Sequence, residues 1–480
     1  MKRLCVLLAL ALLVPLVMAE PVDVDKLLGE QWYGVYMNGK KSGYGTRTLK
    51  KDEQENVFVE SDVHFQISMN SIKQDMRIFS SQKFDPQGQL VEINSVLHDQ
   101  AGDTQFKGVM TGTEMLFSAT VAGQTIQERL PRPKETLDDV LRTVELVQGN
   151  AKVGDKLSYT SYDLVLKTEV NATCEIVGIE ERLAGGVPVR VFKIRSIDDV
   201  MNLEQTTYIT AEGVVLEDVV AQIMTMRLEP MEVAKDVDYS NDTVVSNAAF
   251  VDDPIQNPRE REILTLRIMG PLLQEHLFQD DRQQFTPDGD SYMFTAKRVS
   301  MDGVDAPDLP ISDTSVAEWL TPTTFVQSDN PSIINKAREI VGDEKDSYAA
   351  ARKICDWVSD NLRSTFSARM TNAAEVLESL EGDCTEHSVL FIALARAAGI
   401  PAREVAGLIY MDNGSEPGFY FHQWAKVWAG KWIDMDPTWD QPLVDATHIK
   451  LAEGDIRDQL KIIPLIGQIR IVVVEEGTPR

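Results

Sequence analysis

Cysteine is scarce in this chain of 480 residues, which contains only four: Cys5, Cys174, Cys355 and Cys384. So few cysteines cannot form the disulfide framework of small secreted domains, so stability has to come from apolar cores. Removal of an N-terminal segment, argued below, would leave three, and an odd number leaves at least one thiol unpaired. A free thiol is either a buried, inert residue or a reactive one.

Positive charge is also scarce, because 47 Lys and Arg residues face 75 Asp and Glu residues and the formal net charge is −28. An acidic surface repels phosphate backbones, so we expect no nucleic-acid partner. Beyond the N-terminus the sequence has no apolar run long enough for a bilayer, so we expect a protein that does not span a membrane. A calcium loop of the Asp-x-Asp-x-Asp-Gly type is also missing.

The N-terminus is typical of a secretory signal. Lys2 and Arg3 precede an apolar run from Leu4 to Met18, and the small residue Ala19 follows. This pattern predicts a signal peptide over residues 1–19 and an exported protein, periplasmic or extracellular. An uncleaved anchor is the alternative interpretation.

Periodicity and composition divide the remaining chain into regions, which predict a multidomain protein. Residues 20–240 alternate between strand and turn signals, apart from helical spacing at 135–148, and we expect an antiparallel β-rich domain with one helical connection. Residues 241–311 are expected to form a small β domain and linker, and residues 456–480 to form C-terminal strands. Residues 312–455 contain helices first and strands afterwards, an order typical of an α+β domain.

One cysteine in the α+β region has the setting of a nucleophile. Cys384 follows Gly382-Asp383 at the start of an apolar helix. The unpaired N–H groups and the positive dipole end of a helix N-terminus should lower the thiol pKa. The same N–H groups could hold the oxyanion that forms when a thiolate attacks a carbonyl carbon.

A histidine and an aspartate follow on two predicted strands. His422 and Asp436 would serve as the base and the group that orients it. A two-residue turn at Gly430-Lys431 would put Asp436 on the face opposite His422, whereas a three-residue loop or a bulge near Gly430 would bring both to one face. Asp434 and Asp440 are the rival carboxylates.

Other residues near this pattern suggest further roles. A second oxyanion donor is expected from Asn372, Gln327 or Tyr348, and the sequence does not choose among them. A substrate groove could be lined by several side chains, although at least two of the tryptophans are expected in the core: His387, Trp424, Trp428 and Trp439.

A metal site is the competing interpretation of the cysteine. Cys384 and His387 have the spacing of half a zinc site, and Asp445 with His448 is the candidate second half. We favour a polar or exposed role for His387, and we expect no metal and no cofactor.

Several ordered segments of residues 312–455 resemble the transglutaminase-like core of bacterial exported proteins, a group related to papain-like cysteine enzymes. The resemblance implies a cysteine-bearing helix packed on an antiparallel sheet, with Cys384 as nucleophile, His422 as base and Asp436 as orienter. Residues 445–448 are also similar to bacterial members of the group. The segments are Gly382-Asp383-Cys384, Leu394-Ala395-Arg396-Ala397-Ala398-Gly399-Ile400-Pro401-Ala402-Arg403, His422-Gln423-Trp424 and Trp432-Ile433-Asp434-Met435-Asp436-Pro437-Thr438.

The sequence therefore predicts an exported cysteine enzyme that transfers or hydrolyses acyl groups at protein or peptide amides through a thioester. The alternative is a catalytically silent binding or scaffold protein of the cell envelope. A protein or peptide substrate is the expected partner, and the N-terminal β region could contact an envelope partner.

Overall fold

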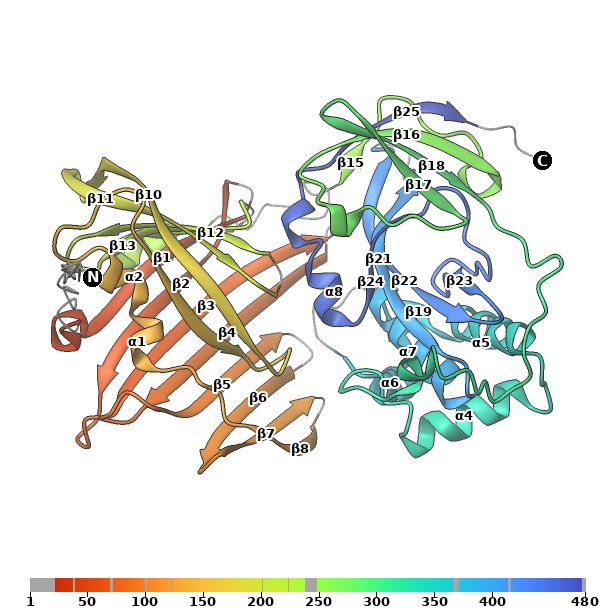
Figure 1. The fold of residues 1–480 in the computed structure, drawn as a ribbon, viewed down its shortest axis with the longest axis horizontal. Helices are drawn as coiled ribbons and strands as arrows, with labels where there is room; N and C mark the ends of the chain where they lie inside the picture. The colour runs from red at the N-terminus through yellow and green to blue at the C-terminus, as the bar shows by residue number, and fades with distance from the viewer. Residues whose placement is uncertain are drawn as a thin grey trace, which may run out of the picture.

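A computed structural model of the chain describes residues 22–37, 39–69, 72–99, 102–121, 123–200, 202–222, 224–237, 248–365, 371–412 and 416–476. The predicted signal segment 1–19 lies outside these residues. None of the helices in the described ranges is both long enough and apolar enough to cross a membrane. Figure 1 shows an N-terminal part made of strands beside a C-terminal part in which helices and strands mix.

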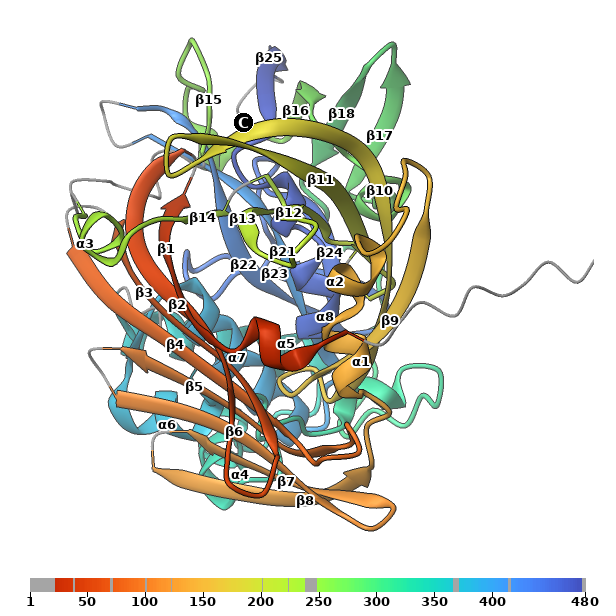
Figure 2. The ribbon, with the colours of Figure 1, turned by 90° about the vertical axis from the view of Figure 1, so that its left-hand side faces the viewer.

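The N-terminal part is one 14-stranded antiparallel sheet, in which two meanders join where β1 pairs with β14. Figure 2 shows this sheet bent into an arch. A β-rich N-terminal region followed by a mixed α/β region was predicted and is confirmed. The strands are β1 (Gly29–Met37), β2 (Lys40–Lys51), β3 (Val57–Met69), β4 (Ile72–Phe84), β5 (Leu90–Asp99), β6 (Gly102–Thr111), β7 (Glu114–Val121), β8 (Gln124–Pro131), β9 (Lys156–Asp163), β10 (Thr168–Ala184), β11 (Val187–Asp198), β12 (Glu204–Thr210), β13 (Val215–Val220) and β14 (Met224–Leu228).

The expected helical connection between the two meanders consists of α1 (Leu137–Val140) and α2 (Arg142–Leu146). Thr136 and Asp139 form a capping box that starts α1. Leu137 and Leu141 pack into a core with β3 to β7, and Val144 packs into a core with β10 to β12. The connection therefore fixes both meanders from their concave side. Short helices flank the sheet at η1 (Val24–Leu27) and α3 (Met231–Ala234).

The mixed region is built around the sheet β15-β22-β21-β24, to which β23 adds by pairing with β22. Asn330 caps α4 by accepting the Ser332 N–H, and Gly399 ends α7 with φ +84°. The elements are β15 (Ala249–Phe250), η5 (Ala317–Leu320), α4 (Pro331–Val341), α5 (Ser347–Asn361), β19 (Arg363–Ser364), α6 (Ala373–Ser379), β20 (Glu381–Gly382), α7 (Cys384–Ala397), β21 (Ala402–Met411), β22 (Gly418–Trp428), β23 (Trp432–Met435) and β24 (Ile449–Gly454).

A second, four-stranded sheet has the order β17-β18-β16-β25 and packs at the opposite end of the long strands β21 and β22 from the helices (Figure 1). Residues 241–311 were expected to form a small β domain and linker. Within the described residues their strands instead share one apolar core with β21, β22 and β24. The further elements are η3 (Pro258–Glu260), β16 (Ile263–Met269), η4 (Gln274–His276), β17 (Gln283–Asp288), β18 (Ser291–Lys297) and β25 (Arg470–Glu476).

The expectation that residues 456–480 contain only strands is wrong for their first half. Residues Ile456–Leu460 form α8 and residues Ile463–Leu465 form η6, and β25 follows. Asp455 caps α8 with a capping box to Asp458. This capping box therefore starts a helix where strands were expected.

The connection between β22 and β23 is a three-residue loop. Trp428 pairs with Trp432, and Lys426 pairs with Asp434. This register extends to put Asp436 on the strand face that carries His422, because directly opposite residues share a face. Of the two loop lengths considered from the sequence, the structure therefore has the one that a shared site requires.

Gly430 makes this loop possible, and its substitution should destabilise the protein. Its φ is +82°, and an added Cβ would lie 2.6 Å from the Asp305 carbonyl oxygen. We predict that Gly430→Ala lowers the free energy of unfolding by roughly 2–4 kcal/mol, from left-handed strain and overpacking. Gly289→Ala is the control, since Gly289 also has positive φ but faces open space, and it should cost about 1 kcal/mol. Urea unfolding measures both, and equal losses would contradict the assignment.

Candidate active site

Cys384 is the first residue of α7 and is partly exposed. Asp383 starts the helix: its carboxylate accepts the Thr385 N–H at 2.8 Å, while Glu386 accepts the Asp383 N–H at 2.8 Å. Asp383 also accepts the Glu386 N–H, which completes a capping box. Three of the four N–H groups that a helix start leaves unpaired are thus used, and the Cys384 N–H remains as a donor.

The start of α7 is joined to β22 beside His422. The backbone N–H of Gln423 donates to the Cys384 sulfur. Ser388 Oγ lies 2.7 Å from the Cys384 carbonyl oxygen and 3.2 Å from that of Gln423. These contacts place the thiol next to the backbone of the residue that follows His422.

His422 and Asp436 form a buried hydrogen bond. His422 Nε2 lies 2.8 Å from Asp436 Oδ2, and Asp436 is fully buried. Burial alone would raise the Asp436 pKa, but the charges and hydrogen bonds of His422 and His448 outweigh it and lower this pKa. Because an ionised carboxylate only accepts, His422 Nε2 carries the proton and Nδ1 is left as the proton acceptor.

The rival carboxylates have other surroundings. Asp434 Oδ1 accepts the indole N–H of Trp424 at 3.0 Å, and Lys426 and Lys450 lie near its other oxygen. Asp440 is exposed and lies in the turn that the β-bridge between Asp436 and Gln441 closes. The structure therefore brings Asp436, and not its rivals, to His422.

A second histidine shares the same carboxylate. His448 Nε2 lies 3.0 Å from Asp436 Oδ2, and His448 Nδ1 lies 3.2 Å from Asp445 Oδ1. Arg259, on η3, donates to Asp445 Oδ2 at 3.0 Å and to Thr447 Oγ1 at 2.9 Å. A chain of contacts thus runs from His422 to Arg259. The sequence reasoning noticed residues 445–448 but gave them no role in the triad.

The two carboxylates fix the charge of His448. Both ring nitrogens face groups that only accept hydrogen bonds, so both must carry protons. Burial lowers the His448 pKa, but the charges and hydrogen bonds of Asp445 and Asp436 outweigh this and raise it. Asp436 therefore lies between His422 and a buried imidazolium.

The prediction of a lowered thiol pKa is wrong. Burial, followed by the nearby Asp383 carboxyl, raises the pKa of the Cys384 thiol well above its ordinary value. The Gln423 N–H opposes this but does not outweigh it. The helix N-terminus contributes less than expected because Asp383, as cap, occupies its N–H groups and adds a carboxyl group beside the thiol.

The residues expected to line a groove separate into buried and accessible ones. Trp424 is fully buried, and His387 is buried with Nδ1 2.7 Å from the Asp383 carbonyl oxygen, so neither forms a groove surface. Burial also lowers the His387 pKa. Trp428 is half-buried against Trp432, whereas Trp439 is 41% exposed beneath the Arg259 guanidinium.

The three candidates for a second oxyanion donor have structural contacts. Asn372 caps α6 by accepting the Glu375 N–H at 3.1 Å. Gln327 accepts the Ala374 N–H at 3.3 Å, and Tyr348 packs against the core of the helical layer. Among the described residues, Gln423 Nε2 is buried without a hydrogen-bond partner, and sequence reasoning did not consider it.

The metal site suggested from the sequence is not the grouping that the structure forms. Ligand atoms of His422, Asp436 and His448 lie within 4.8 Å of one another, which is a donor set that zinc or iron accepts. In the hydrogen-bonded state the Nε2 atoms carry protons, so an ion would have to displace them. Neither Cys384 nor His387 belongs to this grouping.

Comparisons with known proteins agree with the geometry. Residues 334–437 match the model of the transglutaminase-like superfamily. The chain is 29% identical over 101 residues to an uncharacterized protein of Mycobacterium leprae and 33% identical over 99 residues to one of Haemophilus influenzae. These matches cover 20% and 19% of the chain, and 35% and 26% of the two relatives' lengths.

A solved structure from Cytophaga hutchinsonii, provisionally named a cysteine protease, shares 20% identity, with a TM-score of 0.29, over 45% of this chain and 83% of that one. At the level of the family, the superfamily match supports a cysteine-type enzyme.

The thiol pKa can be measured by alkylation. We predict that the rate of Cys384 modification by iodoacetamide, followed by peptide mass spectrometry, rises with pH to a midpoint above that of a free cysteine. Asp383→Asn removes the carboxyl group and should lower the midpoint, since removal of a negative charge favours the thiolate. A plateau of fast labelling already at neutral pH would show a preformed thiolate and contradict this prediction.

Proposed function

Because residues 334–437 contain a transglutaminase-like domain, we propose that this chain is a cysteine enzyme that transfers or hydrolyses acyl groups at protein or peptide amides. Cys384 is the nucleophile, His422 the base and Asp436 the orienter. The observation that carries the proposal is the 2.8 Å contact between His422 and the buried Asp436. His422 lies on β22, and the backbone N–H of the next residue, Gln423, faces the Cys384 sulfur.

The chemistry follows from the proton positions. His422 Nδ1 takes the thiol proton as Cys384 Sγ attacks the amide carbonyl carbon. The tetrahedral intermediate collapses when the same proton passes to the leaving amine, and a thioester remains. Water then releases a carboxylic acid, or a second amine accepts the acyl group in a transamidation. Since the thiol is neutral at rest, the proton transfer accompanies attack instead of preceding it.

Two donors would stabilise the oxyanion in this proposal. The first is the Cys384 N–H, which the capping box leaves unused. The second is the side-chain amide of Gln423, because it is a buried and unpaired donor on the residue whose main chain contacts the sulfur.

His448 is a positioning residue in this proposal. Its imidazolium holds Asp436 in place and offsets part of its negative charge. The ring centroids of His448 and His422 are 6.0 Å apart, so the imidazolium also packs against the proposed base.

Export completes the proposal. Lys2, Arg3 and the apolar run to Met18 support a cleaved signal and a periplasmic or extracellular location. The substrate would then be a protein or peptide outside the cytoplasm. A binding protein that retains this core without turnover is the alternative, and the raised thiol pKa is the observation that favours it.

Thioester formation can be detected with hydroxylamine as the acceptor amine. The full chain is incubated with a peptide mixture and hydroxylamine, and hydroxamates are counted by mass spectrometry. We predict that Cys384→Ala abolishes them and that Asp436→Asn lowers the rate roughly 10²–10⁴-fold by losing the correct imidazole tautomer. Cys174→Ser is the control, because Cys174 is buried in β10 of the N-terminal sheet.

Two results would contradict the enzyme. Hydroxamates that persist in Cys384→Ala would assign the activity elsewhere, and their absence with every peptide would favour the binding protein.

A chelator should leave the rate unchanged, whereas a loss restored by zinc would assign the His422, Asp436 and His448 grouping to a metal.

The charge of His448 predicts a shift that a purely structural residue would not produce. His448→Gln can still donate to Asp436 but removes a buried positive charge close to the site, and loss of a positive charge disfavours the Cys384 thiolate. We predict that the pH midpoint of Cys384 alkylation rises. Asp445→Asn should give a smaller shift of the same sign, because it weakens the charge of His448. An unchanged midpoint with a loss of stability alone would reduce His448 to a packing residue.

A further inference from the structure

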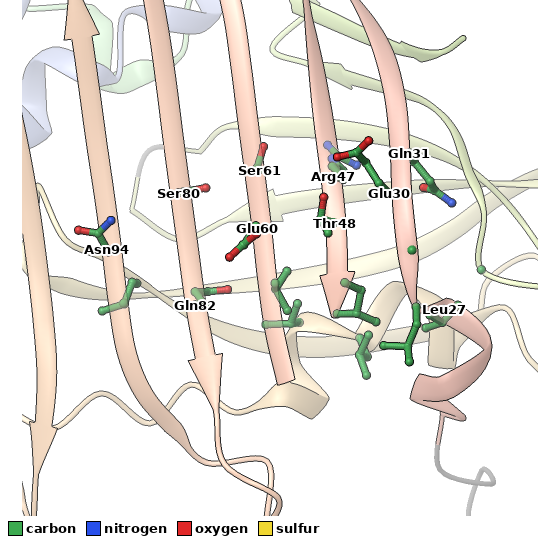
Figure 3. A pocket seen from close by; sticks show the side chains of 18 of the residues that line it. Leu27, Glu30, Gln31, Arg47, Thr48, Glu60, Ser61, Ser80, Gln82 and Asn94 are labelled. Atoms are coloured by element: carbon green, nitrogen blue, oxygen red, sulfur yellow. The ribbon is translucent and has the colours of Figure 1, made fainter. Parts of the chain in front are cut away.

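The concave side of the N-terminal sheet contains a cavity of about 730 Å³ that no part of the proposed reaction uses. It lies between β1 to β5, the end of η1, the α1–α2 connection and the turn after β9 (Figure 3). Its volume is within the range of about 300–1,000 Å³ that small-molecule sites occupy. The lining residues therefore indicate what such a molecule would be.

One row of side chains across the cavity is polar. Five residues are register partners on successive antiparallel strands, so their side chains share one face. Figure 3 shows four of them, on β1 to β4, at one level of the strands. Most are uncharged hydroxyl or amide groups: Gln31, Arg47, Ser61, Ser80 and Ser95.

The neighbouring row, two residues along each strand, is mostly apolar. Leu49, Val59, Gln82 and Ile93 are register partners on β2 to β5 and line the same cavity. The amide of Gln82 donates to the buried Glu135 at 2.7 Å, so its polar end is already occupied. Further apolar side chains complete this floor: Leu27, Leu141 and Leu164.

The cationic side chains of the lining are already paired. Arg47 lies 2.6 Å from Asp218, which is 2% exposed and also accepts from Gln205 and Thr207. Lys26 lies 3.1 Å from Asp23. Among the described residues that line the cavity, an anionic head group would meet no unpaired cation. The polar row therefore suits hydroxyl or amide groups without negative charge.

We propose that this cavity binds an amphiphile with a single fatty-acyl chain and an uncharged head group. The fatty-acyl chain of the ligand lies along Leu49, Val59 and Ile93, where burial of apolar surface supplies the affinity. The head group exchanges hydrogen bonds with the row of Ser61, Ser80 and Ser95. A free lipid and an acylated peptide carry the same chemistry, so the experiment includes both.

Binding can be measured on the full chain by isothermal titration calorimetry, below the micelle concentration of each probe. The probes are a monoacylglycerol, an N-acylated neutral peptide of the same chain length, and the fatty acid itself. We expect saturable one-to-one binding of at least one neutral probe. The fatty acid should bind about tenfold more weakly or worse, because its carboxylate has no cation to pair with.

A matched pair of variants locates the site. Ser80→Trp fills the polar row and should weaken binding more than tenfold. Ser81→Trp places the same ring on the opposite face of β4 and should change affinity less than twofold. Ser95→Trp enters the row from β5 and replaces Ser80→Trp if that variant does not fold, as judged by circular dichroism. Cys384→Ala should bind as the unaltered chain does.

Three outcomes would overturn the proposal. They are the absence of binding by either neutral probe, equal losses in Ser80→Trp and Ser81→Trp, and binding of the fatty acid as tight as that of the neutral probes. Preference for the acylated peptide over the monoacylglycerol would assign the ligand to lipidated proteins, and the reverse preference would assign it to free lipid.

Discussion

The C-terminal half of this protein depends on the sharing of one buried carboxylate, that of Asp436, by two imidazoles. Removing a carboxylate from water is costly unless donors and an opposite charge surround it. Here Thr438 donates a backbone N–H at 2.9 Å to one oxygen, and His422 and His448 face the other. The charge of His448 is in turn held by Asp445 and Arg259. A site of this kind is stable only when every member is present, because removal of one leaves another charge unpaired.

Two local features of the fold position these groups. The length of the 429–431 loop sets the strand face of Asp436, and the capping of α7 sets the position of Cys384. The helices pack against one end of the long strands β21 and β22, and the four-stranded sheet packs against the other end. Arg259 comes from the segment between the N-terminal sheet and β16, so residues outside the family match take part in the site.

The sequence predicted the features that have local signals. The helix that begins at Cys384 follows from Gly382-Asp383 and the apolar run after it, and the β-rich N-terminal region follows from alternation and turn residues. The strand face on which Asp436 lies could be predicted only for a given length of the loop before it, because one residue more or less in that loop moves Asp436 to the other face. The partners of His448 depend on a fold in which residues 259, 436 and 445 meet, and no local pattern reports that. The prediction of a lowered pKa for the Cys384 thiol was wrong for two reasons. It counted helix N–H groups that the Asp383 cap already occupies, and it left out the burial of the thiol.

The sharing of Asp436 is tested most directly by proton NMR of the imidazole N–H groups, which resonate far downfield when they donate to a buried carboxylate. The account predicts separate downfield signals for His422 and His448. His422→Gln should remove one signal and His448→Gln the other, and Asp436→Asn should shift both. Signals for only one of the two histidines, or no response of either to Asp436→Asn, would contradict it.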